Sequence, residues 1–502
     1  MVFSVLKGSQ SGERRYGMKT EAVKMDRRAF IKGGGAAAAA ALGGGCASIG
    51  GGADMLAYLG GTPVVAPGCA PKGIDGLFAW PIVNDAMRRA SDDVLVARKM
   101  SGTDITKEFE RKFAEWQGSK YALACINGTT ALNTAFYAIG VGPGDEVICP
   151  TLTFWASCMG VVNLGGTVVF ADIKEEDLTL DPASFEARIT PRTKAVVAVH
   201  YMGCPCDMDA IMAIARRHGL KVIEDVSHAQ GGHYKGRRLG TIGDIGAMSL
   251  MSAKAFAVGE AGMMTTDSRT YFERGMAWGM YERMAGFMAE DDFRRTLNVP
   301  FGGIKNRLNP CTAAIGLEQL KKYDAERMEI DRAMKYWWDQ IKDIPFISII
   351  YPKHPRSDKA GWYASRGHYD TAGAHGVDNR VFAEAVNAEL AGLGGARHVT
   401  AGANFPLHWS SVYDGEDIFG NGQPPSRRFL PPGVTPRTLT GELPVAEGIN
   451  ARLVGDPWFK HCDTALIDIF AEAMHKVAKN IDRLRGLEPR REGYAYWSRR
   501  RA

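Results

Sequence analysis

Lys254 lies in the segment MSLMSAKAFAVGEAG, from Met248 to Gly262, where small and apolar residues surround it and Glu260 is the only acid. A lysine in apolar surroundings costs free energy unless it is paired or neutral. Two interpretations are open: Lys254 is either a solvated surface lysine or an amine that forms a Schiff base with a carbonyl compound. The other reactive residues of the chain have to decide between them.

Two further segments carry residues of matching chemistry. Asn127-Gly128-Thr129-Thr130 stands between a predicted strand and a predicted helix, where free backbone N–H groups and hydroxyls suit a phosphate; a plain helix N-cap is the alternative. Asp225 ends the apolar run KVIED and precedes His228. It is either a structural cap or the acid that holds a charged ring nitrogen. A phosphate site, such an acid and the amine of Lys254 are together what pyridoxal phosphate requires.

The elements that must position these residues alternate regularly from Tyr121 onward. Strands are predicted at YALACIN, DEVICP, TVVFADI, TKAVVAVHYMG, KVIEDV, GAMSLM and AGMMTT. DMDAIMAIARRHG has apolar residues at helical spacing, and Gly219 is expected to end that helix. Nearly continuous apolar strands separated by helices predict a mostly parallel sheet covered on both faces. Such sheets bind ligands at the carboxyl ends of their strands, where all three candidate segments lie.

Four segments resemble, in order and spacing, the DegT/StrS family of pyridoxal-phosphate aminotransferases, which is best known for aminating keto-sugars. They are NGTTAL (127–132), PTLTFWAS (150–157), EDVSHAQG (224–231) and SLMSAKAFAVGEAG (249–262). The resemblance covers roughly residues 60–480. It implies an α/β fold of the aspartate-aminotransferase type (fold type I), with a mostly parallel sheet, helices on both faces and a smaller C-terminal α+β domain.

The resemblance gives the two central domains, and the composition of the two ends gives the rest. An export signal and linker are expected at 1–54, a large cofactor-binding domain at 55–345, a small C-terminal domain at 346–482 and a basic tail at 483–502. The segment 412–440 is rich in Gly, Pro and Arg and resembles an enlarged loop.

The resemblance also gives individual residues a role. Lys254 would be the Schiff-base residue and Asp225 the acid opposite the pyridinium nitrogen, so both would be catalytic. The other expected cofactor contacts are Gly128, Thr129 and Thr130 in the phosphate loop, Ser249 at the phosphate, Phe154 stacked on the ring and His228 at the ring hydroxyl. No metal site is indicated.

A partner subunit is expected to contribute to the site, because members of this family are dimers with shared active sites. The matching segment is GGIKNRLNPCTAAIG (302–316). Arg307 is its expected substrate-binding residue. Lys305 stands where Asn is common; it either reaches the phosphate across the dimer or is a solvated lysine.

The activity implied is transfer of an amino group in two half-reactions, from an amino-acid donor, glutamate or glutamine, to a keto-sugar-like acceptor. Relatives that have His in place of this lysine catalyse dehydration. The presence of Lys254 argues against dehydration as the reaction of this chain. Other reactions of the same cofactor, such as elimination or lyase chemistry, stay open, as does a non-catalytic binding protein. A nicotinamide-dependent oxidoreductase is disfavoured because no glycine fingerprint lies within a β-α-β unit.

The first fifty residues are typical of an export signal. Arg27-Arg28 precedes Phe30, Ile31 and Lys32, and a Gly/Ala-rich run follows. This order resembles the twin-arginine signal, with Met25 as a possible start. Export is therefore expected, with lipid anchoring at Cys46 as a minor alternative and a cytoplasmic location if the signal is misread.

The charge distribution and the cysteine spacing argue against a nucleic-acid-binding protein, a disulfide-stabilised protein and a zinc protein. The chain of 502 residues carries a formal net charge of +5, most of it in the arginines of the last 21 residues. No basic stripe with interleaved aromatic residues exists, so nucleic-acid binding is not indicated. The nine cysteines are scattered and predict neither a disulfide framework nor a zinc site.

Overall fold

The computed structural model describes residues 55–280, 283–284, 299–394, 398–418, 420, 422, 424 and 427–490. The predicted export signal, with Arg27, Arg28 and Cys46, lies outside the described residues, as does the basic tail beyond residue 490. No helix in the described part is long and apolar enough to span a bilayer.

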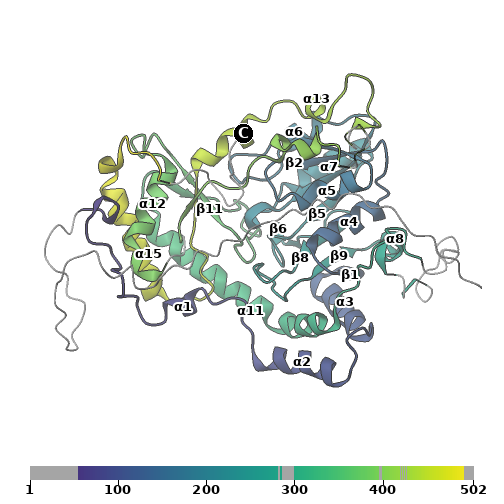
Figure 1. Ribbon diagram of the computed structural model, residues 1–502, viewed down its shortest axis with the longest axis horizontal. Helices are drawn as coiled ribbons and strands as arrows, with labels where there is room; N and C mark the ends of the chain where they lie inside the picture. The colour runs from purple at the N-terminus through teal and green to yellow at the C-terminus, as the bar shows by residue number, and fades with distance from the viewer. Residues whose placement is uncertain are drawn as a thin grey trace, which may run out of the picture. The chain divides into compact units, whose positions relative to one another are not determined.

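The central sheet has seven strands within the described residues, in the order β1-β9-β8-β5-β4-β2-β3. They are β1 (Tyr121–Cys125), β2 (Glu146–Pro150), β3 (Thr167–Ala171), β4 (Thr193–Val199), β5 (Lys221–Asp225), β8 (Ile245–Ser249) and β9 (Gly262–Thr266). Figure 1 labels β1, β9, β8, β5 and β2 among them. β9 pairs antiparallel with β1 and β8, and the remaining pairs are parallel. The predicted mostly parallel sheet is confirmed, and each predicted strand is present.

Helices cover both faces of this sheet, because its strands are apolar on both sides. Alternate strand residues pack against α4 (Gly128–Ala138), α5 (Ala156–Asn163) and α8 (Arg269–Gly279) on one face. The other face packs against α3 (Asp104–Gln117), α6 (Pro182–Glu186) and α7 (Met208–His218). Asp207 caps the start of α7, and Gly219 ends it, as the sequence predicted, in the left-handed conformation.

A second, smaller core surrounds a four-stranded antiparallel sheet of order β10-β11-β13-β12. Its strands are β10 (Ile347–Ile349), β11 (Arg366–Tyr369), β12 (Thr400–Ala401) and β13 (Leu453–Gly455), and its helices include α12 (Asn379–Glu389) and α15 (Thr464–Lys479). The remaining described elements are α1 (Ile74–Leu77), α2 (Asp85–Val96), α13 (Pro436–Thr440), α14 (Pro444–Gly448) and the hairpin β6 (His233–Tyr234) and β7 (Arg237–Arg238).

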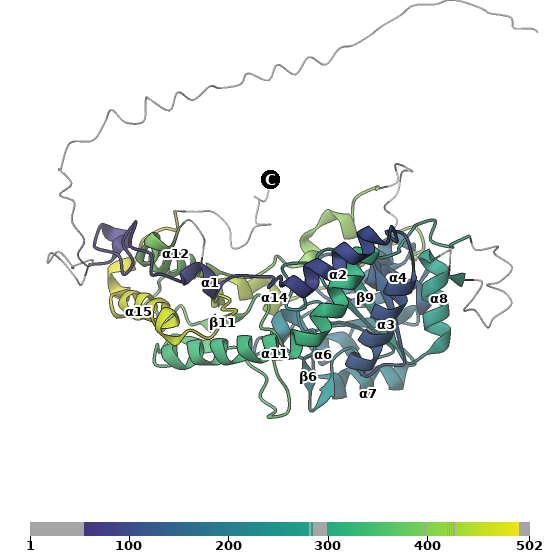
Figure 2. The same ribbon diagram turned by 90° about the horizontal axis from the view of Figure 1, so that it is seen from below.

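Two parts of the predicted large domain pack with this second core instead. Leu56, Ile74 and Leu77 belong to its apolar cluster, as do residues 330–341 of the long helix α11 (Pro310–Ile341). The first half of α11 contacts α2 and α3, and the helix also contacts α15, as Figure 2 makes visible. Some residues before position 345 are therefore buried in the second core, so the predicted domain boundary at residue 345 does not separate the two cores.

Candidate active site

A cavity of about 440 Å³ lies at the carboxyl ends of β4, β5 and β8, beside the first turn of α4. Gly128 and Thr129, Asp225 and His228, and Ser249 and Lys254 all line it, together with Phe154. The three segments singled out in the sequence therefore meet in one place, as expected for the edge of a parallel sheet.

Asp225 is only 4% exposed and is held from both sides. The Ser157 hydroxyl donates to its Oδ2 at 2.7 Å, and the backbone N–H of Ser227 donates to its Oδ1 at 3.0 Å. The Thr153 and Ser157 hydroxyls are themselves 2.7 Å apart. These bonds fix the carboxylate at the end of β5, where a buried charge needs such partners.

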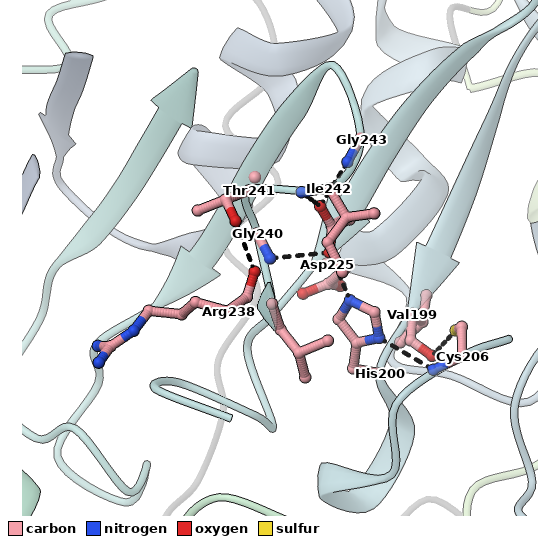
Figure 3. Close-up of polar contacts among 12 residues, drawn as sticks. Val199, His200, Cys206, Asp225, Arg238, Gly240, Thr241, Ile242 and Gly243 are labelled. Carbon is pink, nitrogen blue, oxygen red and sulfur yellow. Dashed lines mark hydrogen bonds and ion pairs between the residues drawn. The ribbon is translucent and has the colours of Figure 1, made fainter. Parts of the chain in front are cut away.

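The preceding residue, Glu224, anchors the same strand from its other face. Its carboxylate accepts the backbone N–H groups of Gly240, Ile242 and Gly243 at 2.6–2.8 Å, and His200 Nε2 lies 3.0 Å away. Figure 3 shows His200, Gly240, Ile242 and Gly243 gathered beside Asp225. Burial raises the pKa of Glu224, but the bonds from His200 and the backbone outweigh it and lower the pKa overall.

The tautomer of His200 follows from its second bond. The backbone N–H of Cys206 donates to His200 Nδ1 at 3.1 Å, so the ring proton is on Nε2 and is donated to Glu224. The strand that ends at Asp225 is thus anchored by a buried network whose donors and acceptors match.

Lys254 is 8% exposed and lies above an aromatic ring, with its Nζ 3.9 Å from the centre of the Tyr363 ring. The indole N–H of Trp80 donates to its backbone carbonyl at 2.8 Å, which fixes the loop. Burial lowers the pKa of Lys254 to about 8, against the opposing effect of Asp225. The solvated-lysine interpretation is therefore wrong for this structure, since the amine is buried in the cavity wall.

His228 has a neutral ring with a defined orientation. The backbone N–H of Met202 donates to its Nδ1 at 3.2 Å, so Nε2 carries the proton. Burial, and then the nearby Lys254, hold the pKa of His228 well below its usual value. Its ring also contacts Tyr363, with 4.6 Å between ring centres. His228 therefore acts as a hydrogen-bond donor through Nε2.

The start of α4 is packed closely against Ser249. A Cβ placed on Gly128 would lie 2.5 Å from the Ser249 Cβ, and one on Gly262 would lie 2.1 Å from the Asn127 carbonyl oxygen. Only glycine allows either approach. The first N–H groups of a helix have no acceptor within it, so those of Gly128 and Thr129 begin α4 at the cavity.

Thr130 departs from the prediction, because it does not line the cavity. Its backbone N–H donates to the Asn127 side chain at 2.9 Å, and its hydroxyl donates to the Asn127 carbonyl at 2.9 Å. It completes a capping box. Asn127 and Thr130 thus form the N-cap of α4, and Asn127 also lines the cavity beside Gly128 and Thr129.

Lys305 and Arg307 do not line the cavity of this single chain either. The residue between them, Asn306, is buried; its Oδ1 accepts the Ile126 N–H at 3.1 Å and its Nδ2 donates to Thr134 at 3.0 Å. The segment is thereby tied to the junction between β1 and α4.

Sequence reasoning missed several lining residues. Ser157 and Ser227 stood inside segments that had been singled out, so the signal was present. Tyr363 and Arg366 come from the second core and had none. Arg366 Nε donates to the Gly402 carbonyl at 2.7 Å, and its Nη1 bonds two further carbonyls. Burial lowers the pKa of this guanidinium.

Comparison with known proteins places this site in context. The DegT/DnrJ/EryC1/StrS aminotransferase family matches residues 83–415, well over half of the chain. The spore coat polysaccharide biosynthesis protein SpsC of Bacillus subtilis (strain 168) is 40% identical over 285 residues, which is 54% of this chain and 71% of that protein. GDP-perosamine synthase of Caulobacter vibrioides is 43% identical over 233 residues, covering 46% of this chain and 60% of that protein.

Solved structures agree with the sequence relatives. An aminotransferase from Psychrobacter cryohalolentis superimposes with a TM-score of 0.67 at 27% identity, covering 81% of this chain and all of that one. DesI, solved in the presence of its TDP-sugar product, gives 0.66 at 26% identity, covering 84% and 96%.

Proposed function

Because this chain belongs to the DegT/DnrJ/EryC1/StrS aminotransferase family, we propose that it moves an amino group from glutamate or glutamine to a keto-sugar or similar carbonyl acceptor. It is a pyridoxal-phosphate-dependent aminotransferase of fold type I. One observation carries the proposal: a buried amine, Lys254, and a buried carboxylate, Asp225, line one cavity with the first turn of α4.

The residues present fit pyridoxal phosphate. The N–H groups of Gly128 and Thr129 and the Ser249 hydroxyl would hold the phosphate. Asp225 would hold the ring nitrogen, His228 Nε2 would donate to the ring hydroxyl, and Phe154 would cover one face of the ring. Each of these groups lines the cavity, and each has the charge or the hydrogen-bonding role that its position needs.

When bound, pyridoxal phosphate supplies an aldehyde for amines and a ring that withdraws electrons from the adjacent carbon. Lys254 supplies the amine and moves the proton. With a pKa near 8, about a tenth of its amine is neutral at pH 7, compared with well under a thousandth at the ordinary lysine value. The desolvated wall that lowers this pKa also keeps water from the proton in transit.

The donor's carboxylate needs a cation in the cavity. Arg366 lines it, and its bonds to backbone carbonyls fix the plane of the guanidinium. A planar guanidinium suits a carboxylate. We therefore propose Arg366 as a donor-binding residue of this chain, beside the role proposed for Arg307 across a dimer.

A homodimer is part of the proposal. Val299, Phe301 and Ile304 are exposed apolar residues beside Lys305, and Ile126 is exposed next to α4. Exposed apolar surface in one area favours a protein interface. A second copy on this area would bring its own Lys305 and Arg307 near the first copy's cavity. Light scattering of the purified protein should give twice the chain mass.

Export by the twin-arginine pathway is also proposed, on the order of residues 27–32 and the run that follows. Residues 25–55 fused to a reporter should be exported when the pathway is intact. Replacement of Arg27 and Arg28 by lysine should retain the reporter in the cytoplasm.

The decisive experiment separates the two half-reactions. The purified holoenzyme is mixed with ¹⁵N-labelled glutamate or glutamine, and the visible band of the cofactor and the keto-acid product are followed. Keto-sugars are then added and the labelled amine is sought by mass spectrometry. Wild type should transfer the label, and Lys254→Ala and Asp225→Asn should not, while both variants keep the native circular dichroism.

Other outcomes would change the assignment. Release of free ammonia with loss of a substituent from the substrate would indicate elimination chemistry. A protein that takes up no cofactor would be a binding protein, and the proposal would fail.

A further inference from the structure

A second cavity, of about 920 Å³, adjoins the catalytic one. Thr153, Phe154, Trp155 and Asn404 line both cavities. We call the second cavity the annex; it lies between residues 153–159, residues 404–413 and Arg437. The annex is therefore the neighbouring hollow toward which a large molecule bound in the catalytic cavity would extend.

The annex is lined mainly by apolar and aromatic side chains. Trp155 is 43% exposed and Trp409 38% exposed, and every other tryptophan in the described part of the chain is less exposed than these two. Phe405 lies with its ring centre 6.0 Å from that of Trp409. Large aromatic surfaces left open to water in one hollow are typical of a ligand site.

The walls of the annex are fixed in place. The Leu407 N–H donates to the Thr151 carbonyl at 2.8 Å, and His408 Nδ1 lies 2.7 Å from the Thr151 hydroxyl. The Tyr413 hydroxyl donates to the Trp155 carbonyl at 3.3 Å. The segment 405–413 is thus docked on the turn between β2 and α5, and the annex is formed before a ligand arrives.

The charge balance of the annex decides what it can hold. Arg437 is the charged side chain among its lining residues, all of which are described. Its Nε is 3.2 Å from Asp414 Oδ2, and Asp414 also pairs with Arg427. Asp414 is shared by both arginines and offsets only part of the Arg437 charge, so the annex offers one partly compensated cation. A diphosphate carries more than one negative charge and would need further cations, whereas a hydrocarbon needs only the apolar wall.

We propose that the annex binds a hydrocarbon group carried by the amino acceptor. The inference rests on the proposed function, since it takes the acceptor's carbonyl to lie beside Lys254. The acceptor is then an amphiphile: a keto-sugar-like head in the catalytic cavity, joined to an alkyl or comparable apolar group that lies against Trp155 and Trp409.

Binding of unreactive probes tests this without turnover. Octyl and methyl β-glucoside, both below micelle-forming concentrations, are titrated into the holoenzyme and followed by calorimetry and tryptophan fluorescence. Each fully buried methylene strengthens binding by about fourfold, so octyl glucoside should bind at least about tenfold more tightly than methyl glucoside. Trp409→Ala should abolish this preference. Phe429→Ala, an exposed aromatic residue outside the annex, should leave it intact.

Two results would overturn the inference. One is equal binding of both glucosides to wild type. The other is tight binding of a nucleoside-diphosphate glucose that Trp409→Ala weakens, which would make the annex a nucleotide site. Trp409→Glu serves as a second variant that places a charge in the annex, and it should likewise abolish the preference for octyl glucoside.

The donor half-reaction separates this inference from the proposed function. With glutamate, Trp409→Ala should change the cofactor band at the wild-type rate, because Trp409 lines only the annex. If wild type fails that step, the proposed function fails while the glucoside result still stands on its own.

Discussion

Replacement of Gly128 by alanine should weaken both the fold and the hold on the cofactor. The new Cβ would lie 2.5 Å from the Ser249 Cβ and 2.8 Å from its Cα, roughly 1 Å closer than ordinary contact. The neighbour is backbone, so it cannot rotate away, and α4 must shift from the end of β8. Overpacking of this kind costs about 1–3 kcal/mol of unfolding free energy.

The same shift moves the N–H groups that would hold the phosphate. Losing one charge-assisted hydrogen bond costs about 1.5–3 kcal/mol, which is about tenfold to a hundredfold in the dissociation constant. Titration of apoenzyme with pyridoxal phosphate, read at the visible band, measures this directly. Gly448→Ala is the matched control, since nothing lies within 4 Å of its Cβ position. Unchanged affinity and thermal stability in Gly128→Ala would refute the reasoning.

Two further predictions concern pH. The pKa of Lys254 is about 8 because its amine is buried. The rate of cofactor uptake by apoenzyme, measured by stopped-flow absorbance, should therefore rise about tenfold per pH unit below pH 8 and level off above it. A rate that still rises at pH 10 would contradict burial as the cause of the lowered pKa. Glu224 has a lowered pKa in the folded state, so its contribution is present above its ordinary value of 4.5 and is lost as pH falls through the folded value. Glu224→Gln should therefore cost about 3 kcal/mol at pH 7 and much less in acid, as urea unfolding at both pH values would show; an equal loss at both would exclude the carboxylate's charge as the cause.

The strands and the site segments could be predicted because their signals are local. Apolar runs mark β1 to β5, β8 and β9, and reactive residues that follow such runs must meet at one edge of the sheet. Lys254 and Asp225 were found in this way. The N-cap and phosphate-loop interpretations of 127–130 were treated as alternatives, yet the two are compatible: Asn127 and Thr130 cap α4, and Asn127, Gly128 and Thr129 line the cavity.

Contacts between distant parts of the chain could not be predicted. Tyr363 and Arg366 reach the cavity from the second core, more than a hundred residues after Lys254, and no local pattern marks them. Likewise, Leu56 and Leu77 precede the large sheet in sequence but pack with the second core. Which of two apolar surfaces such a segment covers depends on shape complementarity, which hydrophobic periodicity does not encode.

The long helix α11 runs without interruption through both cores. Its 32 residues span about 48 Å without a break. Tyr323 is buried in one core and Ile330 in the other. Rotating one core against the other would require bending α11 or breaking its backbone hydrogen bonds between those two residues. We therefore expect opening and closing of the catalytic cavity to involve the loops around it, and heat to melt both cores in one transition.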